Sequence, residues 1–292
     1  MKEDFYYQLN QTHKNLDNQE YIEATTKMMK STFEKQQEKE RLLIIGAGNL
    51  NDFDLDYFLS VFNEVYLSDI DTVSVKKSLE EKINSPKIKV EQIDYLGFVE
   101  SGFFDNFHDL LKMVDYKKVQ LFFVEKFKML GKYQLSKKFN LQFDTIYISP
   151  IYTQLLYRQI EVELDQLVEL GFSLEYRRQI LIEILQMMIP IIDNFNNGIY
   201  ELLIEKGNVF VGSDIFYLDD NSFSKSIKTN INDHDKIESI YLDYHNHYGF
   251  GIGDYGLYSL LQQLKLKQEI WVLWGKNQKN IYAVKFCEMD KI

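Results

Sequence analysis

The stretch RLLIIGAGN, residues 41–49, decides the fold. Its apolar run ends directly in two glycines, Gly46 and Gly48, with Ala47 between them. A short apolar run of this kind is typical of a strand that is buried on both faces of a parallel sheet. Glycines at the carboxyl end of such a strand permit a tight turn and a close approach of the backbone to a ligand. We therefore expect a buried strand followed by a ligand-binding turn.

Strands and helices alternate on the carboxyl side of this turn. Apolar residues recur at helical spacing over 53–62, and EVYLSDID (64–71) is typical of a second strand that ends in acid. A polar helix over 73–84 and a third strand over 88–95 follow. This order of elements predicts an α/β fold with a doubly wound, mostly parallel sheet.

The rest of the chain extends this pattern. Residues 96–142 are rich in aromatic residues and lysine, and we interpret them as an insertion. Their lysines indicate either a solvated helical face or a docking patch for an acidic partner. We further predict a strand over 143–149, a helical region over 152–195 with a break at Gly171, a strand over 207–218, a polar loop over 219–236, and a terminal β-hairpin over 269–289 around the turn GKNQKN.

Residues 1 to about 38 contain no glycine or proline and place apolar residues at helical spacing. We expect them to form helices that pack on, or cover, the domain that follows. The predicted organisation is therefore an N-terminal helical extension (1–40) and a nucleotide-binding type of domain (41–292), with the insertion at about 96–142.

Composition narrows the function. The formal net charge of -11 disfavours general nucleic-acid binding, because an acidic surface repels phosphates. Cys287 is the single cysteine, which excludes an intrachain disulfide and a cysteine-rich metal site, and we expect a cytoplasmic protein without a metal. The N-terminus has no apolar signal-peptide segment. The apolar stretch 180–192 is too short to span a bilayer, so we predict a buried helix and no membrane association.

Asp69 supports a nucleotide-like ligand at the first glycine turn. It ends the second predicted strand, about 20 residues past the glycines, where a carboxylate can bind ribose hydroxyls. Asn51 occupies the position of the third glycine of a dinucleotide fingerprint, which argues against NAD and FAD and suits a ligand without phosphates. The alternatives are that the glycines serve only the turn and that Asp69 caps a helix, although Asp71 is the better cap candidate.

A complete G-x-G-x-x-G occurs at GFGIGDYG, residues 249–256. No predicted strand ends directly before it, and the motif alone is weak support for a nucleotide site. We interpret it as a helix entry or as a flexible, tyrosine-rich loop of an active site.

In the order and spacing of these segments, the chain resembles the Rossmann-like (class I) S-adenosylmethionine-dependent methyltransferases. LLIIGAGN resembles their first motif, YLSDID the second, EQIDY the end of the third strand and FDTIYISP the fourth strand. The family closes a seven-stranded sheet with one antiparallel strand, which agrees with the terminal hairpin. The resemblance covers residues 41–292 except 96–142 and identifies no substrate-defined subfamily.

The resemblance implies S-adenosyl-L-methionine as the cofactor. It also implies that Gly46, Ala47 and Gly48 lie beside the methionine part, that Asp69 binds the ribose hydroxyls, that Asp94 and Tyr95 flank the adenine, and that Ser149 and Pro150 lie near the reacting methyl. Asn49 and Ile70 are further candidates for binding the cofactor.

Methyl transfer needs alignment of the acceptor, and a base only where the acceptor carries a proton. Our candidates for catalysis are His245 and His247, in a segment (243–258) interpreted as a polar, aromatic loop, and Tyr152, which follows the fourth strand. Each has packing or local hydrogen bonding as its alternative role.

The sequence SPIY differs from the Asn/Asp-Pro-Pro-Tyr/Phe motif of amino-methylating DNA enzymes, so DNA is not the expected substrate. We expect a small-molecule acceptor. The alternatives are an aminopropyl or aminobutyl transferase on the same fold, a catalytically inactive binding module, and a nucleotide-sugar or NAD enzyme. The acceptor and the oligomeric state stay undetermined at this level.

Overall fold

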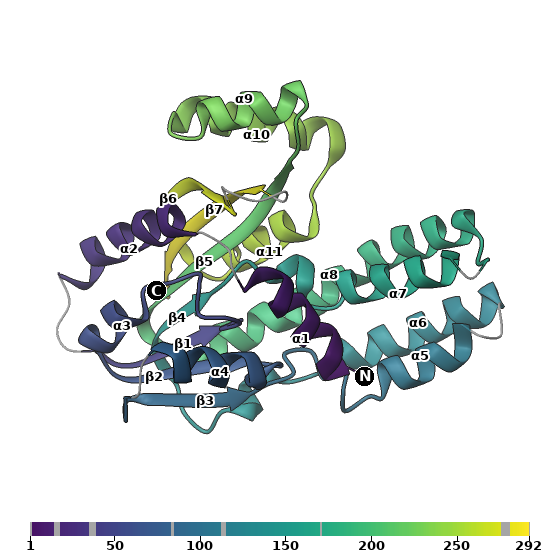
Figure 1. Ribbon diagram of the computed structural model, residues 1–292, viewed down its shortest axis with the longest axis horizontal. Helices are drawn as coiled ribbons and strands as arrows, with labels where there is room; N and C mark the ends of the chain where they lie inside the picture. The colour runs from purple at the N-terminus through teal and green to yellow at the C-terminus, as the bar shows by residue number, and fades with distance from the viewer. Residues whose placement is uncertain are drawn as a thin grey trace.

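The computed structural model describes residues 2–14, 18–34, 39–82, 85–111, 115–169, 171–275 and 281–291. Its centre is a seven-stranded sheet in the order β3-β2-β1-β4-β5-β7-β6 (Figure 1). β7 is antiparallel to both β5 and β6, whereas the other neighbouring strands are parallel. The strands are β1 (Lys39–Ile45), β2 (Phe62–Asp69), β3 (Ile88–Gln92), β4 (Phe143–Ile148), β5 (Leu203–Leu218), β6 (Lys265–Trp274) and β7 (Ile281–Asp290).

This sheet confirms the predicted fold class, and with it the resemblance to the class I methyltransferases at the level of the fold. The predicted C-terminal hairpin is formed by β6 and β7. Residues 276–280 of its turn lie outside the described residues.

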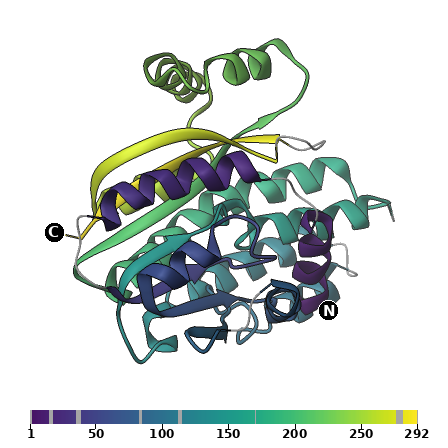
Figure 2. The same ribbon diagram turned by 60° about the vertical axis from the view of Figure 1, so that its left-hand side comes forward.

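Helices cover both faces of the sheet. Before β1 lie α1 (Lys2–His13) and α2 (Gln19–Phe33), and α2 runs along β6, as Figure 2 shows. The remaining helices are α3 (Leu55–Val61), α4 (Thr72–Lys82), α5 (Phe103–Leu111), α6 (Tyr116–Leu130), α7 (Tyr157–Glu169), α8 (Leu174–Leu202), α9 (Ser222–Asn230), α10 (His234–Tyr248) and α11 (Ile252–Leu261), with the short 3-10 turns η1 (Leu135–Lys138) and η2 (Tyr152–Gln154).

The apolar run of β1 is explained by the two cores that flank it. Leu43 and Ile45 belong to a cluster with α5, α6, α7, α8 and α11, whereas Leu42 and Ile44 belong to a cluster with α2 and α3. Because successive side chains of a strand point to opposite faces, a strand between two helical layers must be apolar at every position.

Residues 219–236 were expected to form a polar loop, and this prediction is wrong. They form α9 and the start of α10, which project from one side of the sheet in Figure 1. The side chain of Asn221 caps α9 by accepting a hydrogen bond from the backbone N–H of Ser224. Ile227 and Ile237 then bury against Trp271 of β6 in a separate small core.

Helix α8 corrects a second prediction. The apolar stretch 180–192 lies in a helix that is buried on one side only, because Ile182 is 53% and Ile189 is 42% exposed. Among the described helices, none is both long enough and apolar enough to cross a membrane.

The glycines of GFGIGDYG serve helix packing. A Cβ atom at Gly256 would lie 2.5 Å from Cδ1 of Tyr152, whose ring is fully buried. A Cβ at Gly253 would lie 2.7 Å from the Ser213 hydroxyl on β5. The motif is therefore the entry of α11, with Gly251 at its N-cap, and its glycines let that helix approach β5 and η2 closely.

This packing predicts a stability effect. We expect Gly256→Ala to lower the free energy of unfolding by about 1–3 kcal/mol, because the buried Tyr152 ring must shift to admit a methyl group. Urea denaturation measures the change. Gly251→Ala is the matched control, since its Cβ would meet only a carboxylate oxygen of Asp254 at 3.3 Å. Equal stability of the two variants would contradict this account.

Candidate functional site

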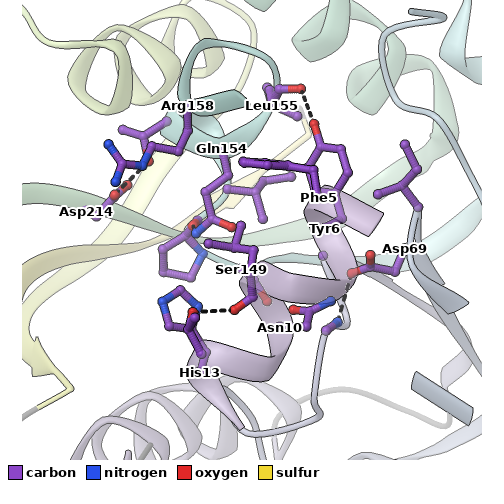
Figure 3. Close-up of a pocket in the computed structure, with 18 of the residues that line it drawn as sticks. Phe5, Tyr6, Asn10, His13, Asp69, Ser149, Gln154, Leu155, Arg158 and Asp214 are labelled. Atoms are coloured by element: carbon purple, nitrogen blue, oxygen red, sulfur yellow. Dashed lines mark hydrogen bonds between the residues drawn. The ribbon is translucent and has the colours of Figure 1, made fainter. Parts of the chain in front are cut away.

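A cavity of about 690 Å³ lies where β1, β2, β4 and β5 end at the carboxyl edge of the sheet. Ligands of doubly wound sheets bind at such a crevice. The loops after these strands line it on one side, and α1 lines it on the other (Figure 3). The volume is in the range of sites for small molecules and cofactors.

The loop after β1 is built around two left-handed glycines, Gly46 with φ of 76° and Gly48 with φ of 49°. A Cβ at Gly46 would also lie 2.4 Å from Cγ2 of Ile151, so this position requires glycine for conformation and for space. A helix does not follow the glycine turn directly, because α3 begins only at Leu55 behind its cap Asp54.

The backbone N–H groups of the glycine turn, those of Gly46, Ala47 and Gly48, are donated within the protein. Gly46 donates to the Tyr95 hydroxyl (2.9 Å), Ala47 to the Ser68 carbonyl (3.0 Å) and Gly48 to Oδ2 of Asp69 (2.8 Å). Cradles for phosphate need such groups to point at the ligand. The loop is therefore poorly suited to a pyrophosphate, in line with the absence of the third glycine.

Asp69 ends β2 at the cavity and is 8% exposed. Its Oδ2 accepts from Gly48, and its Oδ1 accepts from the backbone N–H of Asp71 (2.8 Å). Burial raises the pKa of Asp69 to about 6, although these hydrogen bonds lower it. Each carboxylate oxygen keeps a second lone pair, so the group can still accept hydrogen bonds from a ligand. Asp71 caps α4 through Ser74, as expected.

Ser149 lines the cavity from the end of β4. It is 2% exposed, and its Oγ forms no hydrogen bond with any described residue. A buried hydroxyl without a partner costs free energy, which a polar ligand atom would relieve. Pro150 and Asn49 also line the cavity, and so do Ile70 and Tyr95.

Helix α1 closes the cavity. Tyr6 donates its hydroxyl hydrogen bond to the Leu155 carbonyl (3.2 Å), and Asn10 donates to Oδ2 of Asp71 (2.9 Å). The side chain of Asn49 in turn donates to the Asn10 carbonyl (2.6 Å). These bonds tie α1 to the loops after β1, β2 and β4, so the helix covers the site that those loops form.

Two residues assigned to the cofactor lie elsewhere. Asp94 is not part of the cavity lining; its carboxylate accepts hydrogen bonds from the backbone N–H groups of Leu96, Gly97 and Val99 and so holds a turn. Ala47 belongs to the apolar core on the α2 side of the sheet. The structure therefore does not bring either side chain to the cavity.

The three catalytic candidates are also outside the lining. His245 and His247 lie in the last turn of α10, not in a loop, and His245 contacts Oδ1 of Asp254 at 3.1 Å. Tyr152 is buried in the core, where its hydroxyl donates to Oδ1 of Asn196 (2.9 Å). Their positions give no support to a role in chemistry at this cavity.

The cavity instead contains polar residues that sequence analysis missed. Asp214 of β5 lines it, with Thr153 of η2 donating to its Oδ2 (2.8 Å). Figure 3 shows Asp214 and Arg158 on the side of the cavity opposite Asp69. His13 of α1 lines it as well. The signal that identified Asp69, an acid towards the end of a buried strand, is also present at Asp214.

A group of possible metal ligands lies outside the cavity. His234, Glu238 and Glu269 bring ligand atoms within 4.8 Å of one another. The ammonium of Lys285 already pairs with Glu238 (2.9 Å) and Glu269 (3.2 Å). A cation therefore already balances these carboxylates.

Comparisons with known proteins give matches among solved structures. No family model and no curated protein matches the chain. Among solved structures, N-methyltransferase NodS from Bradyrhizobium japonicum WM9 in complex with S-adenosyl-L-homocysteine is 10% identical, covering 98% of each chain with a TM-score of 0.47. TrmN from Thermus thermophilus is 9% identical, covering 91% of this chain and 48% of that chain with a TM-score of 0.39. An O-methyltransferase family protein from Burkholderia thailandensis is 8% identical, covering 97% of this chain and 58% of that chain with a TM-score of 0.44.

These similarities assign no residue roles. The fold class rests on the order of the strands and the antiparallel direction of β7.

Proposed function

We propose that this protein is an S-adenosylmethionine-dependent methyltransferase that acts on a small molecule. The observation that carries the proposal is the position of Asp69, a carboxylate at the carboxyl end of β2 that holds Gly48 and faces the cavity. This is where a doubly wound sheet binds a ribose. The N–H groups of Gly46, Ala47 and Gly48 are already donated within the protein, which favours a nucleoside ligand without phosphates.

The cavity residues fit such a cofactor. Asp69 would accept hydrogen bonds from the ribose hydroxyls, and the unpartnered hydroxyl of Ser149 would meet a polar atom of the ligand. Gly46 and Gly48 would border the methionine part, and Tyr95, with Leu96 and Phe98, would form the apolar wall for the adenine.

When bound, the cofactor supplies an electrophilic methyl group on a sulfonium. The protein's own residues then have to hold the acceptor in line with that methyl and keep water away. Helix α1, tied down through Tyr6 and Asn10, would exclude water from the cavity. The loop after β4 and Asp214 of β5 would border the acceptor.

We propose that the division of the chain follows these roles. Residues 1–40 would form an extension whose helix α1 covers the site, and residues 41–292 the catalytic domain. Of the insertion at about 96–142, only Leu96 and Phe98 contribute to the described cavity lining. A cavity covered by a helix favours a small acceptor over a macromolecule.

Calorimetric titration tests the cofactor. We expect S-adenosyl-L-homocysteine to bind with micromolar Kd, and NADH to show no binding under the same conditions, because the N–H groups of Gly46, Ala47 and Gly48 are already donated within the protein and are not available to a pyrophosphate. Absence of binding by S-adenosyl-L-homocysteine would overturn the proposed function, and tight binding of NADH would redirect it to a dinucleotide enzyme.

A further inference from the structure

When it is ionised, Asp214 carries a charge that no cation among the described residues balances through an ion pair. Its Oδ2 accepts from the neutral hydroxyl of Thr153, and its Oδ1, shielded from solvent, accepts from no other described residue. Arg158, the one permanent cation among the described lining residues, forms its ion pair with Glu161 and none with Asp214. A carboxylate without a cationic partner in a partly buried site favours a positively charged ligand.

The cavity as a whole has the same preference. Among the described lining residues, Arg158 is the only permanent cation, whereas four carboxylates face the cavity. Burial lowers the pKa of His13, so this side chain is neutral near pH 7. The four carboxylates are those of Asp52, Asp69, Glu163 and Asp214.

The aromatic residues on this side of the cavity agree. Trp274 of β6 and Tyr282 of β7 line the cavity. β7 pairs directly with the end of β5 that carries Asp214, and β6 pairs with the other side of β7. The faces of tryptophan and tyrosine rings attract organic cations. A negative charge and aromatic surfaces therefore occur together on the side opposite Asp69.

We propose that the methyl acceptor is an amine, and that Asp214 binds its ammonium group and takes up its proton. This proposal rests on the proposed function, because the sulfonium methyl is the group to be transferred. An anionic acceptor is disfavoured, since Asp214 forms no ion pair with a cation among the described residues, so an anion beside it would be repelled.

The chemistry balances with these groups alone. The ammonium gives one proton to the Asp214 carboxylate and becomes a neutral amine with a free lone pair. That lone pair attacks the methyl carbon, a C–N bond forms, and the C–S bond breaks with its electron pair going to sulfur. The products are a methylated ammonium and the neutral thioether S-adenosyl-L-homocysteine.

The decisive experiment measures ligand binding to the protein saturated with S-adenosyl-L-homocysteine. The probes are the amines butylamine and 2-phenylethylamine, and the comparison ligands are the carboxylates pentanoate and 3-phenylpropanoate. Calorimetry or ligand-observed NMR measures the affinity of each. We expect at least one amine to bind at least about tenfold more tightly than the carboxylate of matching size. When S-adenosylmethionine replaces S-adenosyl-L-homocysteine, we expect the protein to methylate that amine.

Asp214→Asn should lower the affinity for that amine about tenfold or more, a change expected when a charged hydrogen bond is lost. Its affinity for S-adenosyl-L-homocysteine should stay within about twofold of wild type, which also shows that the variant folds. Asp220→Asn, at an exposed position after β5, is the matched control and should change neither affinity.

The outcomes separate the two proposals. If S-adenosyl-L-homocysteine binds but neither amine is preferred, or if Asp214→Asn binds the amine like wild type, the amine proposal is overturned and the proposed function stands. If S-adenosyl-L-homocysteine does not bind at all, the proposed function fails first and the amine proposal with it.

Discussion

Asp69→Ala is expected to weaken the binding of S-adenosyl-L-homocysteine at least about 100-fold. Two hydrogen bonds from ribose hydroxyls to a carboxylate contribute about 1.5–3 kcal/mol each, and each 1.4 kcal/mol is about tenfold in Kd. The substitution also removes the acceptor for the Gly48 N–H, which lies 2.8 Å from Oδ2, so the loop loses its anchor. Isothermal titration calorimetry on both proteins measures the difference.

Two further variants show whether the carboxylate itself is responsible. Asp69→Asn keeps the shape and one acceptor oxygen, so an intermediate affinity is expected. Asp56→Asn, at an exposed position on α3, should bind like wild type. Micromolar binding retained by Asp69→Ala would remove Asp69 from the site and with it the main support for the proposed cofactor.

Asp214→Asn is expected to stabilise the ligand-free protein at alkaline pH. Burial raises the pKa of Asp214 to about 7, and the nearby carboxylate of Asp254 adds to this effect. Between the unfolded pKa of 3.8 and about 7, the folded protein holds a proton that the unfolded chain has lost. The wild type therefore loses stability as pH rises through this range, whereas asparagine does not titrate.

The advantage of the variant in free energy of unfolding should widen by about 2 kcal/mol between pH 5 and pH 8. Urea denaturation at the two pH values measures it, and the Asp69 contribution cancels because Asp69 is present in both proteins. Asp220→Asn should show no such widening, since that carboxylate is exposed. A gap independent of pH would show that Asp214 is ionised in the folded protein at an ordinary pKa.

A residue whose replacement stabilises the protein but removes ligand binding is typical of functional sites. Such sites keep groups in environments that folding alone would not select. Asp214 would then be retained at a cost in stability because an ammonium ligand balances its charge.

Local patterns were sufficient to predict the sheet. The LLII run of β1 is apolar because helices cover both faces, and this requirement is visible in contiguous residues. The glycine turn and the acid that ends β2 could also be predicted, because turns and strand ends depend on residues that are adjacent in the sequence. Helices α9 and α10 were missed because the apolar residues that hold them, such as Ile227 and Ile237, bury only against distant Trp271.

The features of the site also separate into those predicted from the sequence and those that only the tertiary structure showed. The sequence by itself determined the doubly wound fold, the turn of Gly46 and Gly48 and the candidate carboxylate Asp69, since each depends on neighbours along the chain. The tertiary structure alone decided that α1 covers the cavity, that Asp214 faces it, and that His245 and Tyr152 do not. The physical reason is that packing between elements far apart in the sequence sets the direction of a side chain. The residue type alone does not reveal that direction.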